Sequence, residues 1–183
     1  MKLDPVDYAV ISQALLAAAR EMGTKLVRSA YSNIVREARD ASCAILDPHG
    51  NIVAQSEMVP MQLGSMNTTL RACLAHYPAA SLREDDFLVN NHPYHGGQHL
   101  QDVFIFRPVF VDGELFGFCG SIAHKSDIGG PVPGSCSGQA REIFNEGLHL
   151  PAVRYQRGYR VNGDIERLIG ANSRTPALVL GDI

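Results

Sequence analysis

Two apolar runs separated by a tight-turn dipeptide place the strongest constraint on how this chain can fold. Residues 103–111 and 114–122 are rich in Phe, Val and Ile, and Asp112-Gly113 lies between them. Asp-Gly is a preferred dipeptide of two-residue hairpin loops, because both loop residues need a positive φ. The pattern therefore predicts an antiparallel β-hairpin with these two residues as its loop.

Counting back from that loop brings polar residues together at the open end of the hairpin. A regular two-residue loop pairs Asp102 with Ala123 and Gln101 with His124. Neighbouring strands lie about 5 Å apart, so Asp102 and His124 become diagonal neighbours, with His99 one turn away. Two imidazoles and one carboxylate suit a divalent transition ion such as Zn, Mn or Fe(II), and leave positions open for water or substrate. We therefore predict His99, Asp102 and His124 as metal ligands.

Further polar residues flank this set in two glycine-rich segments, 91–102 and 123–130. Asp127 is a candidate fourth ligand, or an acceptor that orients an imidazole N–H. His92 and His95 are expected to line the site without binding metal. We take Asp127 and His95 as the candidate catalytic residues. The competing interpretation, in which these are only surface or hydrogen-bonding residues of a loop, stays open.

A rival nucleophile is Cys136, at the centre of residues 134–138, which have the form Gly-x-nucleophile-x-Gly. A nucleophile elbow needs a strand before it and a helix after it, whereas Pro131 and Pro133 precede this segment. The sequence therefore favours a flexible loop over the site. Neither Gly-Gly pair belongs to a Walker loop, so no nucleotide site is recognisable.

The remaining periodicities predict an α+β fold, with β-hairpins packed with flanking helices. Asp4 and Pro5 suit the start of a long amphipathic helix. The expected elements are helices at about 5–30, 66–76 and 162–172, a second hairpin at 41–46 and 51–55, and a short strand at 87–89.

Composition excludes some classes of function. A net charge of -3, without a Lys/Arg cluster, argues against nucleic-acid binding. The first residues lack the basic and apolar regions of a signal peptide, and no apolar run is long enough to span a membrane. The four cysteines form no Cys-x-x-Cys pair and are expected to be reduced, which points to the cytoplasm.

The polar motifs resemble those of the hydantoinase B/oxoprolinase family. The matching residues in the two glycine-rich segments are Asn91, Pro93, Tyr94, Gly96, Gly97, His99, Asp102, Ala123, His124, Asp127, Gly129, Gly130, Pro133, Gly134 and Ser135. Residues 39–44, 63–66 and 142–148 also resemble the family, as do Asn172, Arg174 and Pro176. The likeness covers essentially the whole chain.

Four positions depart from the family pattern. His92 stands where the family usually has Asp, and Gln101 where it often has Pro. Met58 and Gln62 replace residues that are often His. These differences leave the substrate, and any second metal or substrate contact at those positions, open.

The resemblance implies an activity and a partner. The family includes ATP-dependent hydantoinases, 5-oxoprolinases, and acetone and acetophenone carboxylases. It implies that a hydantoinase A-type subunit uses ATP to phosphorylate a carbonyl or enol oxygen, and that this chain acts on the activated small molecule within a hetero-oligomer. In the acetone carboxylase branch, the residues matching His99, Asp102 and His124 hold a manganese-type ion.

Three functions follow as expectations. The first is a subunit of a cyclic amide hydrolase, inactive without its partner. The second is a carboxylase subunit that stabilises an enolate at the same metal. The third is a non-catalytic remnant that only binds a partner.

Family subunits are much longer than this chain, so residues 1–183 are expected to be a single amino-terminal portion, truncated at the carboxyl end. The apolar run at 177–180 is then expected to lie exposed or to seek another molecule, unless it packs as a terminal strand.

Overall fold

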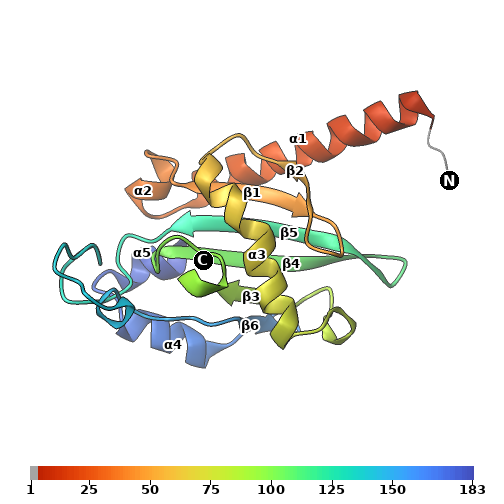
Figure 1. Ribbon diagram of the computed structural model, residues 1–183. Helices are drawn as coiled ribbons and strands as arrows, with labels where there is room; N and C mark the ends of the chain where they lie inside the picture. The colour runs from red at the N-terminus through yellow and green to blue at the C-terminus, as the bar shows by residue number, and fades with distance from the viewer. Residues whose placement is uncertain (1–3) are drawn as a thin grey trace.

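A seven-stranded antiparallel sheet, in the order β2-β1-β5-β4-β3-β6-β7, forms the centre of the computed structural model, which describes residues 4–183 (Figure 1). The strands are β1 (Ala41–Leu46), β2 (Ile52–Gln55), β3 (Phe87–Asn90), β4 (Asp102–Val111), β5 (Glu114–His124), β6 (Val153–Arg157) and β7 (Arg160–Val161). The helices are α1 (Pro5–Ser29), α2 (Asn33–Arg36), α3 (Pro60–His76), α4 (Gly163–Ala171) and α5 (Pro176–Gly181). Three single turns of 3-10 helix are η1 (Ala79–Ser81), η2 (Pro93–His95) and η3 (Ile143–Asn145). The predicted α+β class is confirmed.

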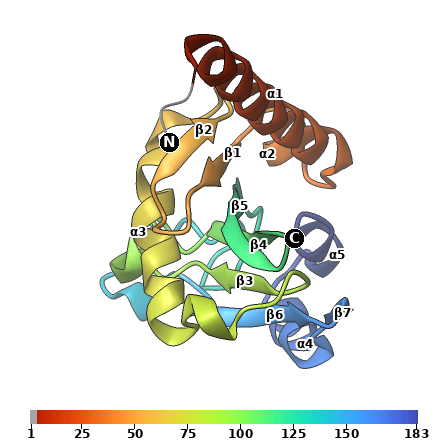
Figure 2. The same cartoon turned by 90° about the vertical axis from the view of Figure 1, so that its right-hand side faces the viewer.

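Apolar side chains of the sheet enter cores on both of its faces. Along β4, Phe104 and Phe106 belong to the core under α3, whereas Val103 and Ile105 belong to the core under α4 and α5. This alternation follows from the two-residue period of a strand. Figure 2 shows α3 on one side of the sheet and α4 and α5 on the other. No helix among residues 4–183 combines the length and the apolar character that a membrane span requires.

The β4–β5 hairpin has its predicted loop but not its predicted register. Asp112 and Gly113 both have positive φ, at 51° and 83°, as a tight hairpin loop requires. Beyond it the pairing shifts, because Phe116 is an extra residue with no partner on β4, which is a β-bulge. Asp102 therefore faces His124 directly, and the expected pairing of Asp102 with Ala123 is wrong.

Element boundaries also differ from expectation. The helix expected at 66–76 begins earlier, at Pro60. Its first turns were not predicted because the polar residues Gln62 and Ser65 are buried on its inner face and interrupt the apolar periodicity. The run at 177–180 forms α5, and Val179 in it is completely buried in the core shared with α4. The expectations of an exposed run and of a terminal strand are therefore both wrong for Val179.

Candidate metal centre

The three predicted ligands meet where β4 begins and β5 ends. Asp102 is the first residue of β4 and His124 is the last residue of β5, and the two are paired across the hairpin. His99 lies in the turn just before β4, where its carbonyl accepts a hydrogen bond from the Asp102 N–H at 3.2 Å. The bulge at Phe116 thus brings His124 opposite Asp102, and the turn adds His99.

One buried carboxylate connects both imidazoles. Asp102 Oδ2 lies 3.0 Å from His99 Nδ1, and Asp102 Oδ1 lies 2.8 Å from His124 Nδ1. The Asp102 side chain is 1% exposed, that of His124 is 15% exposed and that of His99 is 51% exposed. The candidate ligand atoms of these residues lie within 4.8 Å of one another, and no other such group of His, Cys, Asp or Glu occurs among residues 4–183. The open side of the cluster is therefore the His99 side.

The charge of Asp102 favours a cation at this point. No lysine or arginine within residues 4–183 forms an ion pair with it. Lys125, which directly follows His124 in the sequence, is buried and donates instead to the carbonyl oxygen of Asp182. Burial lowers the pKa of Lys125 to about 8, against an opposing effect of Asp182. A buried carboxylate needs a compensating charge, so the donor set of two nitrogens and one oxygen fits a divalent transition ion.

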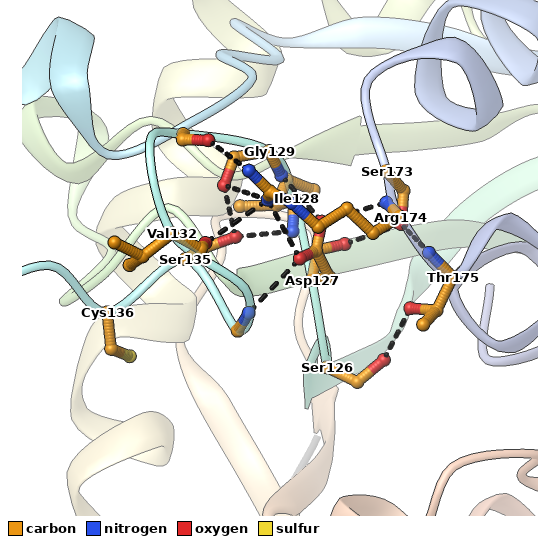
Figure 3. Close-up of polar contacts among 12 residues, drawn as sticks. Ser126, Asp127, Ile128, Gly129, Val132, Ser135, Cys136, Ser173, Arg174 and Thr175 are labelled. Carbon is orange, nitrogen blue, oxygen red and sulfur yellow. Dashed lines mark hydrogen bonds and ion pairs between the residues drawn. The ribbon is translucent and has the colours of Figure 1, made fainter.

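Asp127 lies outside this group and binds the backbone instead (Figure 3). Its oxygens accept hydrogen bonds from the backbone N–H groups of Gly129, Gly134 and Arg174, at 3.0–3.1 Å, and from the Arg174 guanidinium at 3.1 Å. Burial acts to raise the pKa of Asp127, but these hydrogen bonds outweigh it and hold the pKa below its usual range. The catalytic role predicted for Asp127 stays a prediction.

His92 and His95 lie in a separate cavity, next to a histidine that the sequence did not single out. The His92 ring stacks on that of His95, with centroids 4.6 Å apart, and lies 5.3 Å from the ring of His149. All three line one cavity. His149 stands alone in its stretch of sequence, without a motif or a spacing that could have identified it. The catalytic role predicted for His95 likewise remains to be tested.

The loop that contains Cys136 is not a nucleophile elbow. Residues 125–142 contain no strand and no helix, so the elbow geometry is absent, as predicted. The thiol is exposed and has the Gln101 amide as a partner at 3.7 Å. Figure 3 shows the Cys136 side chain apart from the hydrogen bonds around Asp127.

Gln101, which was expected to face His124, instead holds the two glycine-rich segments together. Its backbone carbonyl accepts a hydrogen bond from the backbone N–H of Lys125 at 2.8 Å, and its side-chain amide donates to the backbone carbonyl of Ser135 at 2.7 Å. Gln101 therefore fixes the residues next to Asp102 against those next to His124.

Comparison with known proteins identifies the sequences and the structure to which this chain is similar. The sequence profile of the family described as Hydantoinase B/oxoprolinase matches residues 4–183. The chain is 39% identical over 151 residues to 5-oxoprolinase of Saccharomyces cerevisiae, covering 82% of this chain and 12% of that protein. It is 33% identical over 181 residues to caprolactamase subunit beta of Pseudomonas jessenii, covering 99% of this chain and 31% of the relative.

A solved structure has the same fold. The crystal structure of the ATP-dependent caprolactamase from Pseudomonas jessenii superposes with a TM-score of 0.83 at 29% identity, over 100% of this chain and 31% of the other. The chain thus spans about a third of the length of the caprolactamase subunit, and a smaller share of the yeast oxoprolinase.

Proposed function

Because the chain belongs to the hydantoinase B/oxoprolinase family, we propose that it is part of the catalytic subunit of an ATP-dependent hydrolase that opens a cyclic amide. The observation that carries the proposal is the convergence of His99, Asp102 and His124 at the open end of the β4–β5 hairpin. The relatives support the substrate class, since the names 5-oxoprolinase and caprolactamase both refer to cyclic amides.

His99, Asp102 and His124 would hold a divalent transition ion. When bound, such an ion supplies Lewis acidity at a carbonyl oxygen. Asp102 fixes the orientation of both imidazoles through their Nδ1 atoms, and its burial keeps water from competing for its oxygens. His99 is half exposed, so a small substrate has access from its side.

ATP would be used by a partner. The sequence has no recognisable phosphate-binding loop. One relative is by name a beta subunit, and its crystal structure is that of an ATP-dependent enzyme. We infer a hetero-oligomer with a hydantoinase A-type subunit that activates the substrate carbonyl.

The test is substrate-dependent ATP hydrolysis by the complex of this chain with its ATP-using partner. Alongside a parallel assay with the ketone acetone, the cyclic amides hydantoin, 5-oxoproline and caprolactam are offered with and without bicarbonate, and the ring-opened product is measured. The proposal expects one of them to stimulate ATP hydrolysis without bicarbonate, and expects His124→Ala but not His49→Ala to abolish the effect. His95→Ala and Asp127→Asn in the same assay test the two predicted catalytic residues.

Two other results would each replace the proposal. Turnover that requires bicarbonate and a ketone substrate would indicate a carboxylase subunit. A complex that binds metal but turns over none of these substrates would indicate a non-catalytic remnant that only binds its partner.

A further inference from the structure

A cavity of about 610 Å³, distinct in its residues from the candidate metal centre, is lined by His92, His95 and His149. His92 and His95 belong to the segment at η2, and His149 belongs to the segment before β6. None of the residues that line the cavity is Asp, Glu, Lys or Arg. The polar character of the cavity therefore comes mainly from its imidazoles.

The buried side chain of Asn91 holds these segments in place. Its amide nitrogen donates to the carbonyls of Leu100 at 2.7 Å and Leu148 at 2.9 Å, and its oxygen accepts the Leu150 N–H at 2.7 Å. The Asn91 N–H donates in turn to the Leu150 carbonyl at 3.1 Å. Because Asn91 is completely buried and has all these partners, His149 is fixed beside His92.

The imidazoles offer donors to the cavity. His92 Nδ1 is buried and has no hydrogen-bond partner among residues 4–183, so the other ring nitrogen, Nε2, is the one that a ligand in the cavity can reach. His95 Nδ1 lies 3.3 Å from the Asn90 amide nitrogen, which is a donor, so the proton of a neutral His95 ring belongs on Nε2. His149 Nε2 lies 3.3 Å from the Ile143 carbonyl and donates to it, so protonation of that ring adds a donor at Nδ1.

No carboxylate among residues 4–183 forms an ion pair with His92, His95 or His149. Burial, followed by His95 and His149, lowers the pKa of His92. The His76 ring of α3 lies 6.3 Å from that of His95, and Tyr94 of the η2 segment itself lies beside His92. Behind Gly129 and Gly130, which line the cavity, the Arg174 guanidinium is already paired with Asp127. A negative group among the rings would favour their protonated forms.

Apolar side chains line the cavity beside the imidazoles. Phe144 is 78% exposed and stacks on His149, with centroids 5.4 Å apart and planes 18° apart. Leu148 and Pro151 also line the cavity. We propose that this cavity binds a small organic anion, either a carboxylate or a phosphate monoester, with its oxyanion accepting hydrogen bonds from the imidazoles of His92, His95 and His149 and its apolar part against Phe144.

The test is a titration of the full chain in EDTA, which removes any contribution from the candidate metal centre. Benzoate and phenyl phosphate are the probes, and ring ¹H–¹⁵N NMR signals of the histidines report binding at pH 6 and pH 8. Saturable shifts of His92, His95 and His149 are expected for at least one probe, with affinity about fivefold or more tighter at pH 6, because protonated imidazoles favour the anion.

Matched variants test whether probe binding depends on the histidines of the cavity or on other histidines of the chain. His92→Asn combined with His149→Asn should weaken binding about tenfold or more, a loss of about 1.4 kcal/mol, whereas His49→Asn in the β1–β2 turn should leave it unchanged. Phe144→Ala should weaken binding of both probes. Because the Phe144 ring is exposed, this variant provides the test if the double variant does not fold. Because no metal is present, these results are independent of the proposed hydrolase activity.

The probe that binds identifies the chemical class of the anion. Binding of phenyl phosphate alone indicates a phosphate monoester, binding of benzoate alone indicates a carboxylate, and binding of both supports the shared oxyanion site. Absence of saturation with both probes would overturn the proposal. So would an affinity that stays the same in the double variant and in Phe144→Ala.

Discussion

Two buried aspartates of this chain, Asp127 and Asp102, differ in how the protein compensates their charge. Asp127 receives three backbone N–H groups and a guanidinium. Asp102 has the imidazoles of His99 and His124 as side-chain partners and no ion pair with lysine or arginine within the described chain. Asp127 is therefore compensated by the protein itself, whereas Asp102 favours a bound cation.

Replacing Asp127 with Asn should lower the free energy of unfolding near pH 7 by about 2–3 kcal/mol, the contribution of hydrogen bonds to a charged group. The folded pKa of Asp127 is depressed, so its contribution is present above the unfolded pKa of about 3.9 and is lost as the pH falls through the folded pKa. Chemical denaturation of both proteins from pH 7 to pH 3 measures this.

The difference between wild type and Asp127→Asn should therefore shrink on acidification. Asp164→Asn is the matched control, since Asp164 forms an exposed pair with Arg167, and such pairs contribute little. A difference that stayed constant down to pH 3 would show that the charge of Asp127 does not stabilise the fold.

The sequence could predict the three candidate ligands because they lie close to one strong hairpin signal. Asp102 and His124 are related by the Asp112-Gly113 loop, and His99 lies three residues before Asp102. His149 could not be predicted in the same way. It reaches His92 only through long-range hydrogen bonds of Asn91, and no local pattern encodes those.

Among the elements, the bulge in β5 decides the register of the candidate site. Inserting an alanine after Phe116 should shift the pairing beyond the bulge by one residue, so that Asp102 faces Ala123 and His124 moves out of register with Asp102. We expect the insertion to lose bound metal, whereas deletion of Phe116 removes the bulge but keeps Asp102 opposite His124 and should retain the metal. Metal retained by a folded insertion variant would show that this register does not place the ligands.

The docking of α5 is a second test at this scale. Val179 is completely buried in the core shared with α4, so Val179→Ala should lower the free energy of unfolding by about 2 kcal/mol through lost contacts and a small cavity. Val53→Ala on β2, at a half-exposed position, should change it by less than about 0.5 kcal/mol. Equal effects in denaturant titrations would mean that α5 does not dock in solution.

The elements that the sequence did not predict have weak local signals. The strands β6 and β7 are short, and β6 is paired with β3 across more than sixty residues of chain. The apolar residues of α5 form one uninterrupted run, which periodicity cannot assign to a helix or a strand. The long α1 and the two hairpins were predictable because caps, periodic apolar residues and turn residues agree there.

For the whole molecule, we expect that ATP is hydrolysed by a partner subunit and not by this chain alone. The isolated chain should show no ATP hydrolysis stimulated by hydantoin or 5-oxoproline, because its sequence contains no recognisable phosphate-binding loop. Phosphate release by the isolated chain, and by the chain mixed with its ATP-using partner, measures this. Activity of the isolated chain above that of a buffer control would mean that it contains a nucleotide site of its own.

The central claim is that His99, Asp102 and His124 together hold a divalent metal ion. Elemental analysis of the purified protein after reconstitution and desalting tests it most directly. We expect a divalent transition metal in the wild-type chain and in His49→Ala, whose imidazole lies in the β1–β2 turn, and almost none in His99→Ala or His124→Ala. Equal metal content in all four folded proteins would contradict the account.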